Sequence, residues 1–181
     1  MLPGTIKYFS IFLLMVSLAW GSYGLIGAGT YPVALVNNKV VWGKEFKTTH
    51  QSALNFYGKL KNPDVDQPTF EKEIRRATLD KLIESRLIFE EVGRAEIDNQ
   101  LANLVSQNPN LEKGAVLTYG IPWVDFKNLV LRPQIALEIL QKDLQDKNKN
   151  FDEWLKNKRI SASVWIFVGG LDWQDSQVVA E

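Results

Sequence analysis

Cysteine is absent from this chain of 181 residues, and histidine occurs once, as His50. Without cysteine there is no disulfide scaffold, thiol nucleophile or cysteine-based zinc site, and one histidine cannot supply both a catalytic triad and a metal site. Net charge is absent too, because 21 basic and 21 acidic side chains cancel. A neutral chain has no overall attraction for polyanions, so nucleic acid is not an expected partner.

Sequence motifs for catalysis and cofactor binding are also missing. No serine lies in a Gly-x-Ser-x-Gly sequence, and there is no phosphate-binding P-loop. Asp64 and Asp66 lack the further ligands of a calcium loop. His50 lies on the apolar side of a predicted helix, which favours a core histidine over a catalytic one. We therefore expect no catalytic residue, no metal site, no cofactor and no nucleotide.

Charged side chains are missing from Tyr8 to Asn38. The 21 residues from Tyr8 to Ala28 match the length of a helix that crosses a hydrocarbon core roughly 30 Å thick, at about 1.5 Å per residue. Lys7 and the amino terminus supply a positive cytoplasmic flank. The alternative is a cleavable signal peptide with Phe9 to Ala19 as its apolar region and a cleavage site near Gly21. Residues 1–29 are thus predicted to be a transmembrane signal anchor or a signal peptide.

Both interpretations place the remainder of the chain outside the cytoplasm. A retained anchor predicts a single-pass membrane protein that contacts the lipid bilayer through residues 8–28. Cleavage predicts a secreted or periplasmic protein instead.

A β-hairpin is predicted immediately after this segment. A two-residue turn at Asn37 and Asn38 opposes Val36 with Lys39, Leu35 with Val40, Ala34 with Val41 and Val33 with Trp42. Asparagine tolerates positive φ, so Asn-Asn can replace the Asn-Gly that a type I′ turn prefers. This register predicts one apolar face made of Val33, Leu35, Val40 and Trp42.

Helical periodicity follows the hairpin, and about five helices are expected. The first begins near Lys44, and a loop over Lys61–Gln67 separates it from a long helix that ends near Val92. Later helices cover residues 95–105, a short segment ended by Gly120, and residues 122–144, where Pro133 must kink the helix or start a new one. A final helix of about two turns begins at Phe151.

A β-branched and aromatic segment from Ser161 to Val168 predicts a strand near the carboxy terminus. A lone strand has no partner for its backbone groups, so we expect it to pair with the hairpin. The predicted fold is therefore mostly α with a small antiparallel sheet closed by both ends of the chain. The predicted domain covers residues 30–170, and residues 171–181 are expected to form an exposed tail.

Aromatic residues are numerous for a small helical domain. Most must pack in the core, because burial of a large aromatic side chain contributes roughly 1.5 to 3 kcal/mol. Helices with wide apolar stripes can still leave an apolar groove between them. The candidate groove residues are Phe56, Tyr57, Tyr119, Ile121, Trp123 and Phe126.

Three segments resemble the SurA N-terminal domain family, the helical module of extracytoplasmic chaperones that accompany parvulin-type peptidyl-prolyl isomerases. "VALVNNKVVWGKEF" is similar to its opening hairpin and first helix. "RRATLDKLIESRLIFEEVGR" is similar to its long central helix, and "AEIDNQL" to the helix that follows. The resemblance covers about residues 31–145. Asn38 stands where the family usually has a turn glycine.

The resemblance implies a chaperone that binds unfolded or translocating polypeptides without ATP. Relatives carry a parvulin domain after the helices, whereas about 16 residues separate Leu144 from Ser161 here, so no isomerase activity is expected. The alternative from another class is a non-catalytic adaptor that docks one folded envelope partner through the same groove or the tail. A residual prolyl isomerase is a distant third interpretation.

Overall fold

The computed structural model describes residues 29–58 and 66–180. The predicted signal anchor or signal peptide lies outside these residues except for Gly29, as does most of the predicted loop at Lys61–Gln67. Within the described residues, no helix is long and apolar enough to span a bilayer. The elements, in chain order, are β1 (Pro32–Val36), β2 (Lys39–Trp42), α2 (Gly43–Gly58), α3 (Gln67–Phe89), α4 (Arg94–Gln107), α5 (Leu111–Tyr119), α6 (Trp123–Phe126), the π-helical turn η1 (Lys127–Leu131), α7 (Arg132–Asp146), α8 (Phe151–Ser161), β3 (Val164–Ile166), β4 (Leu171–Gln174) and β5 (Gln177–Ala180).

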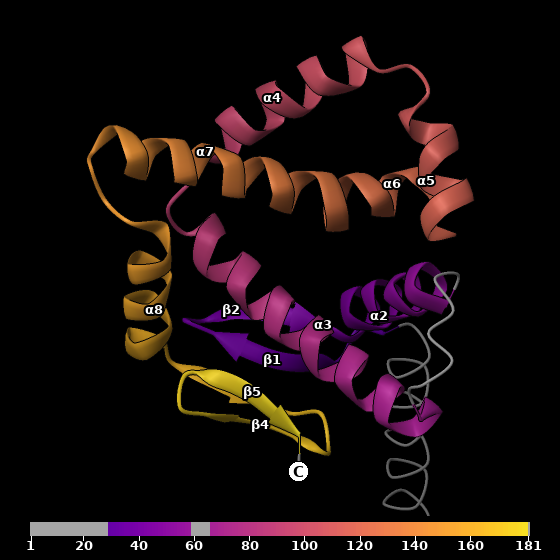
Figure 1. Ribbon diagram of the computed structural model, residues 1–181, viewed down its shortest axis with the longest axis vertical. Coiled ribbons are helices and arrows are strands. Elements are labelled where there is room, and N and C mark those ends of the chain that lie inside the picture. The colour runs from indigo at the N-terminus through magenta and orange to yellow at the C-terminus, as the bar shows by residue number, and fades with distance from the viewer. Residues whose placement is uncertain (1–28, 59–65, 181) are drawn as a thin grey trace, which may run out of the picture.

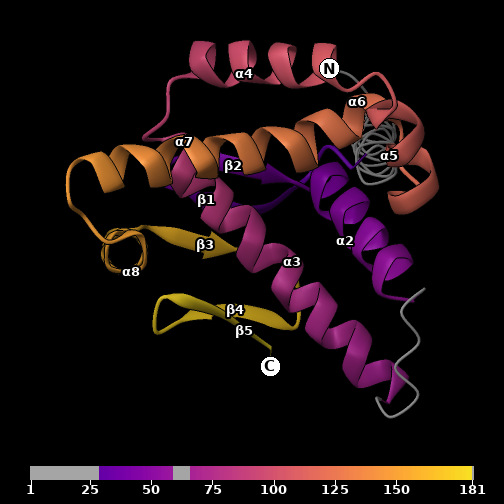
Figure 2. The same cartoon turned by 45° about the horizontal axis from the view of Figure 1, so that its top comes forward.

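The fold is mostly helical with small antiparallel sheets, as predicted. Helix α3 runs diagonally through the molecule, with α7 and α4 stacked on one side of it and the strands on the other (Figure 1). Helix α2 packs beside α3, and α8 connects the helical layer to the carboxy-terminal strands (Figure 2).

The predicted closure of the sheet by a distant strand is confirmed. The strand order is β2-β1-β3, and β3 runs antiparallel to β1 with Leu35 opposite Trp165. The hairpin turn has positive φ at both Asn37 (45°) and Asn38 (66°), as a type I′ turn requires. The side chain of Asn37 also accepts a hydrogen bond from the Ser163 N–H at 2.9 Å, so it joins the turn to the strand that closes the sheet.

The predicted apolar face of the hairpin is wrong in part. The pairs from Ala34 to Val36 occur as expected, but Trp42 lies opposite Pro32 because a β-bulge at Val33 shifts the register. The side chains buried against α3 are Val33, Ala34, Val36 and Val41. Leu35, Val40 and Trp42 point to the opposite face, where they are only partly covered.

Among the residues that the structure describes, two apolar clusters form the core, and α3 contributes to both. The first lies between α3 and the strands and contains Leu79, Ile83 and Leu87. The second lies between the end of α3, α4 and α7 and contains Ile88, Ile139 and Leu140. Because α3 has apolar residues on two sides, it packs against the strands on one side and against α4 and α7 on the other.

Pro133 lies in the first turn of α7, which begins at Arg132, so the prediction that it kinks the helix or starts a new one agrees with the structure in its second form. Elements α6, η1 and α7 follow one another with helical backbone at each junction, and the five residues Lys127–Leu131 form a π turn that ends two positions before the proline. A wider turn accommodates a residue that lacks an N–H donor and whose ring crowds the preceding turn. The end of α5 was predicted correctly: Gly120 caps it in the left-handed conformation with φ of 68°.

The expected exposed tail at residues 171–181 is a second hairpin over its described residues. Strands β4 and β5 pair antiparallel around Asp175 and Ser176, both with positive φ. Leu171 and Val178 are buried in the cluster beneath α3. The turn dipeptide is Asp-Ser rather than the familiar Asp-Gly, which is why the hairpin signal is weak in the sequence.

Candidate binding cleft

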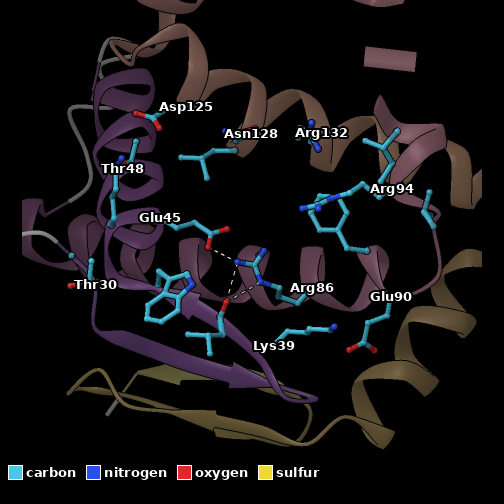
Figure 3. A pocket seen from close by; sticks show the side chains of 18 of the residues that line it. Thr30, Lys39, Glu45, Thr48, Arg86, Glu90, Arg94, Asp125, Asn128 and Arg132 are labelled. Atoms are coloured by element: carbon cyan, nitrogen blue, oxygen red, sulfur yellow. Dashed lines mark hydrogen bonds and ion pairs between the residues drawn. The ribbon is translucent and has the colours of Figure 1, made fainter. Parts of the chain in front are cut away.

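A cleft of about 1080 Å³ opens between the edge of β2, the start of α2, the carboxy-terminal end of α3 and the α6–η1–α7 helix. Strand β2 forms its lower border in Figure 3, and the long upper helix forms its roof. The sheet order leaves β2 at the edge, so its outer side faces this opening. The volume is at or above the upper end of the range of about 300–1000 Å³ found for small-molecule sites.

Apolar side chains from four elements line the cleft. Trp42, from β2, is the most accessible at 47% exposed. The apolar lining residues are Val40, Trp42, Phe89, Val92, Ile97 and Leu129. Leu129 belongs to the π turn, and the neighbouring Asn128 also lines the cleft. The irregular turn before Pro133 therefore places side chains on the wall of the opening.

Arg86 fixes the base of the cleft. Its guanidinium lies 2.5 Å from a carboxylate oxygen of Glu45 on α2, and it also donates to the Val40 carbonyl of β2 through Nε (3.4 Å) and Nη2 (3.3 Å). Figure 3 shows these contacts as dashed lines. Both side chains are less than one-fifth exposed. One arginine thus fixes three walls of the cleft relative to one another.

The remaining charges of the cleft lie mainly at its rim and are more often basic than acidic. These basic residues are Lys39, Lys44, Arg94 and Arg132, and the acidic ones are Glu90 and Asp125. Arg132 pairs with Asp98 of α4 at 2.5 Å. Within residues 29–58 and 66–180, no group of three acidic or histidine side chains is placed to hold a metal ion. The cleft can therefore bind a ligand through apolar contacts and through scattered hydrogen bonds and ion pairs.

The six predicted groove residues lie together, but outside this cleft. Phe56 stacks on Tyr119 with ring centroids 5.7 Å apart, Tyr119 contacts Phe126 at 5.1 Å, and Trp123 contacts Phe126 at 5.9 Å. Tyr57 is 47% exposed, whereas Ile121 and Phe126 are buried. This aromatic cluster joins the end of α2 to α5 and α6. Its binding of clients stays a prediction, in which the two buried side chains cannot take part without movement.

Sequence reasoning missed the residues that line the cleft, although some signals were present. Trp42 was assigned to the apolar face of the hairpin because side-chain alternation does not show which of the two faces packs against α3. Phe89 and Leu129 sit at the edges of helical stripes that were interpreted as core. Only the assembled helices show that these edges face an opening.

The family model for the SurA-like N-terminal domain matches residues 4–118, which is more than half of the chain. The chain belongs to the SurA-like N-terminal domain family. The match runs from the amino-terminal segment into α5, so it includes the sheet hairpin, the cleft base at Arg86 and all of α4. Modules of this family are chaperone-like and by themselves non-catalytic. No curated protein and no solved structure matches the chain.

Within this SurA-like module, two groups of residues are candidates for binding. The cleft combines an accessible tryptophan with an apolar wall, whereas the rings of the aromatic cluster pack against one another. The roof of the cleft, from α6 to α7, lies beyond the residues that the family model matches.

Proposed function

We propose that this SurA-like domain is an ATP-independent chaperone, membrane-anchored or exported, that holds apolar segments of unfolded or translocating polypeptides in the cleft at Trp42. Family membership supports a chaperone-like role. The single observation that carries the assignment to this site is the large open cleft with an apolar lining and a charged rim. Such a lining binds side chains of many sequences, because apolar contact is non-directional.

The size and polarity of the cleft favour an extended segment over a small ligand. A small-molecule site encloses most of its ligand and places a few polar groups in exact positions. Here the polar groups are spread around the rim, and the base is an arginine already engaged with Glu45 and Val40. A client segment would place apolar side chains against Trp42, Phe89 and Leu129 and leave its ends in water.

Suppression of aggregation tests the proposal. The full chain, without ATP, should slow light scattering by a chemically denatured client at several-fold molar excess. The double variant Trp42→Gln, Leu129→Gln should lose most of this effect, because it replaces two accessible apolar side chains of the cleft. Trp165→Gln is the matched control, since it removes a tryptophan that is 64% exposed and outside the cleft.

The aromatic cluster is tested in the same assay with Tyr57→Gln, which changes its most exposed member. Loss of suppression in this variant alone would assign client binding to the cluster and overturn the assignment to the cleft. Photocrosslinking gives a direct readout: a photoreactive residue at position 42 should capture the client more efficiently than one at position 123. Absence of suppression by the unaltered chain would overturn the chaperone proposal.

The adaptor alternative is distinguished by its partner. Saturable binding of one folded envelope protein, with no effect on unfolded clients, would favour the adaptor. An adaptor that binds through a free carboxy-terminal tail is less favoured, because Val178 of that segment is buried.

A further inference from the structure

The outer face of the three-stranded sheet carries an uncovered apolar surface. Val40, Leu35 and Trp165 form one row across the strands, because Leu35 lies opposite both of the others. Trp165 is 64% exposed and Phe167, two residues along on the same side, is 56% exposed. Their neighbours Val164, Ile166 and Val168 instead pack on the cluster beneath α3. Two adjacent large aromatics in water indicate a contact surface.

This surface lies beside the point where the described chain begins. Phe167 donates its backbone N–H to the Val33 carbonyl at 2.9 Å, and on the other side of β1 Trp42 lies opposite Pro32. The aromatic side chains of the outer face therefore flank the start of β1 on both sides.

Backbone hydrogen bonds hold the start of the described chain against the first turn of α2. The Gly29 carbonyl accepts from the Lys44 N–H and the Tyr31 carbonyl accepts from the Gly43 N–H, both at 2.8 Å. The Tyr31 ring lies so close to Gly43 that a Cβ there would be 2.5 Å from a ring carbon. Pro32 follows Ala28 by four positions in the sequence, and an extended chain covers at most about 14 Å over four residue steps.

The chemistry of the surface fits the interfacial zone of a bilayer. Tryptophan and other aromatic side chains concentrate at this level, where an apolar ring can enter the lipid while polar groups remain in water. Lys44 and Lys47 of the first turns of α2 lie beside the start of the domain, and the Lys47 ammonium is 5.4 Å from the centre of the Tyr31 ring. Such lysines attract anionic headgroups. At the opposite end of the hairpin, Asn37 instead contacts Glu90.

We infer that the β3 side of the outer face, formed by Trp165 and Phe167, rests on an anionic bilayer surface next to the membrane anchor, whereas Val40 and Trp42 on the β2 side of this face line the cleft. The inference rests on the anchored form of the proposed function. The anchor and the sheet face then act as two membrane contacts, which fix the orientation of the domain and hold the cleft next to the lipid surface. Trp165 and Phe167 contact lipid and are separate from the residues that line the cleft.

Single cysteines provide the test, because the natural chain has none. Full-length Trp165→Cys and Phe167→Cys are labelled with an environment-sensitive fluorophore and reconstituted into vesicles of phosphatidylcholine and phosphatidylglycerol. Val116→Cys is the matched control: it is 57% exposed on α5, which lies on a different side of the molecule from β3 in Figure 2. All three positions are exposed, so the variants should fold, and circular dichroism checks this.

The expected result is quenching of the labels at 165 and 167 by spin-labelled lipid headgroups, with several-fold less quenching by aqueous iodide than at 116. Equal behaviour at all three positions, in chains that float with the vesicles, overturns the inference and leaves the anchor intact. Chains that do not float overturn both the anchor and the inference, while the aggregation assay still decides client binding.

Two other occupants of the face give different results, and each overturns the inference. Protection from iodide without lipid quenching, lost when the chain is diluted in excess lipid, assigns the face to a second copy. Protection that appears only after an unfolded client is added assigns it to the client.

Discussion

At the scale of single residues, Arg86 has the largest effect on the shape of the cleft. Its side chain is largely buried and donates hydrogen bonds to both Glu45 and the Val40 carbonyl, so it joins α3 to α2 and to the edge strand. A largely buried charge that is paired and hydrogen-bonded fixes geometry, and its loss leaves the partner carboxylate without compensation.

The variant Arg86→Met should lower the free energy of unfolding by about 3 kcal/mol, because Glu45 remains buried without its cation. Urea unfolding followed by circular dichroism measures this. Arg86→Lys is the control: it keeps the charge but cannot contact both partners, so its loss should be smaller. An unfolding free energy unchanged in Arg86→Met would show that the contact contributes nothing.

The surroundings of His50 shift the pKa of its side chain, and this shift affects the stability of the fold. Burial lowers its pKa from the ordinary value of 6.5, and the positive charge of Arg75 lowers it further, against the opposing effects of the backbone and carboxylate of Glu71. Its ring stacks on Phe46, and its Nε2 has no hydrogen-bond partner among the described residues. The neutral form is therefore the one that suits the folded chain.

The pH dependence of stability follows from that direction. Below about pH 6.5 the unfolded chain takes up a proton at His50 more readily than the folded chain does, so the free energy of unfolding falls as the pH drops from 6.5 towards the lower, folded-state pKa. The variant His50→Gln should lose this part of the dependence. Urea unfolding of both proteins between pH 7.5 and 5 tests it, and parallel curves would contradict the assignment.

At the scale of elements, Asp80 of α3 connects the carboxy-terminal segments to the body. Arg159 of α8 donates to its two carboxylate oxygens at 3.1 and 2.6 Å, and the Val178 N–H of β5 donates to one of them at 3.2 Å. Arg159 also lies 5.6 Å from the ring centre of Trp173 on β4. One carboxylate thus orients a helix and a hairpin together.

Asp80→Ala should lower the free energy of unfolding by about 2–4 kcal/mol and loosen the β4–β5 hairpin, because Arg159 and the Val178 amide both lose their acceptor. Hydrogen exchange of Gln177–Ala180 should accelerate. Asp172→Ala removes a partly exposed carboxylate whose partners are local, namely the Trp173 N–H and Gln174, and should leave that exchange unchanged. Equal exchange in the two variants would argue against a connecting role for Asp80.

At the scale of the whole molecule, the two apolar clusters meet on α3, and the second hairpin completes the lower one. Deletion of residues 171–181 removes Leu171 and Val178 from that cluster. Burial of each such side chain contributes roughly 1.5 to 3 kcal/mol, so the truncated chain should be at least about 3 kcal/mol less stable. Thermal unfolding compares the two chains, and equal midpoints would show that the segment is a dispensable tail.

Much of the fold was predictable because it depends on local patterns. Helical periodicity located the helices from α2 to α8 within a few residues, and two consecutive asparagines specified the hairpin turn. The pairing of β3 with β1 was predicted from a general requirement, since an isolated strand cannot satisfy its backbone hydrogen bonds. The family could be recognised from the same segments.

The faces of the strands and the binding surface were not predictable in this way. The bulge at Val33 turns this side chain to the buried face, and packing against α3 rather than side-chain alternation decides which face of the hairpin is buried. The aromatic residues chosen from composition do lie together, but in contact with one another. The cleft forms at the edges of several elements, so no single segment of the sequence contains its signal.

The sequence by itself determined the helices, the hairpin turn and the need to close a sheet with the distant strand, because these follow from local periodicity and from backbone hydrogen bonding. Only the tertiary structure decided that Trp42 and Leu129 line an opening while Phe126 is buried, and that Trp165 and Phe167 remain uncovered. The reason is physical: an apolar side chain has the same propensity whether or not a neighbouring element covers it, and the packing of α3 against both clusters determines which ones are covered.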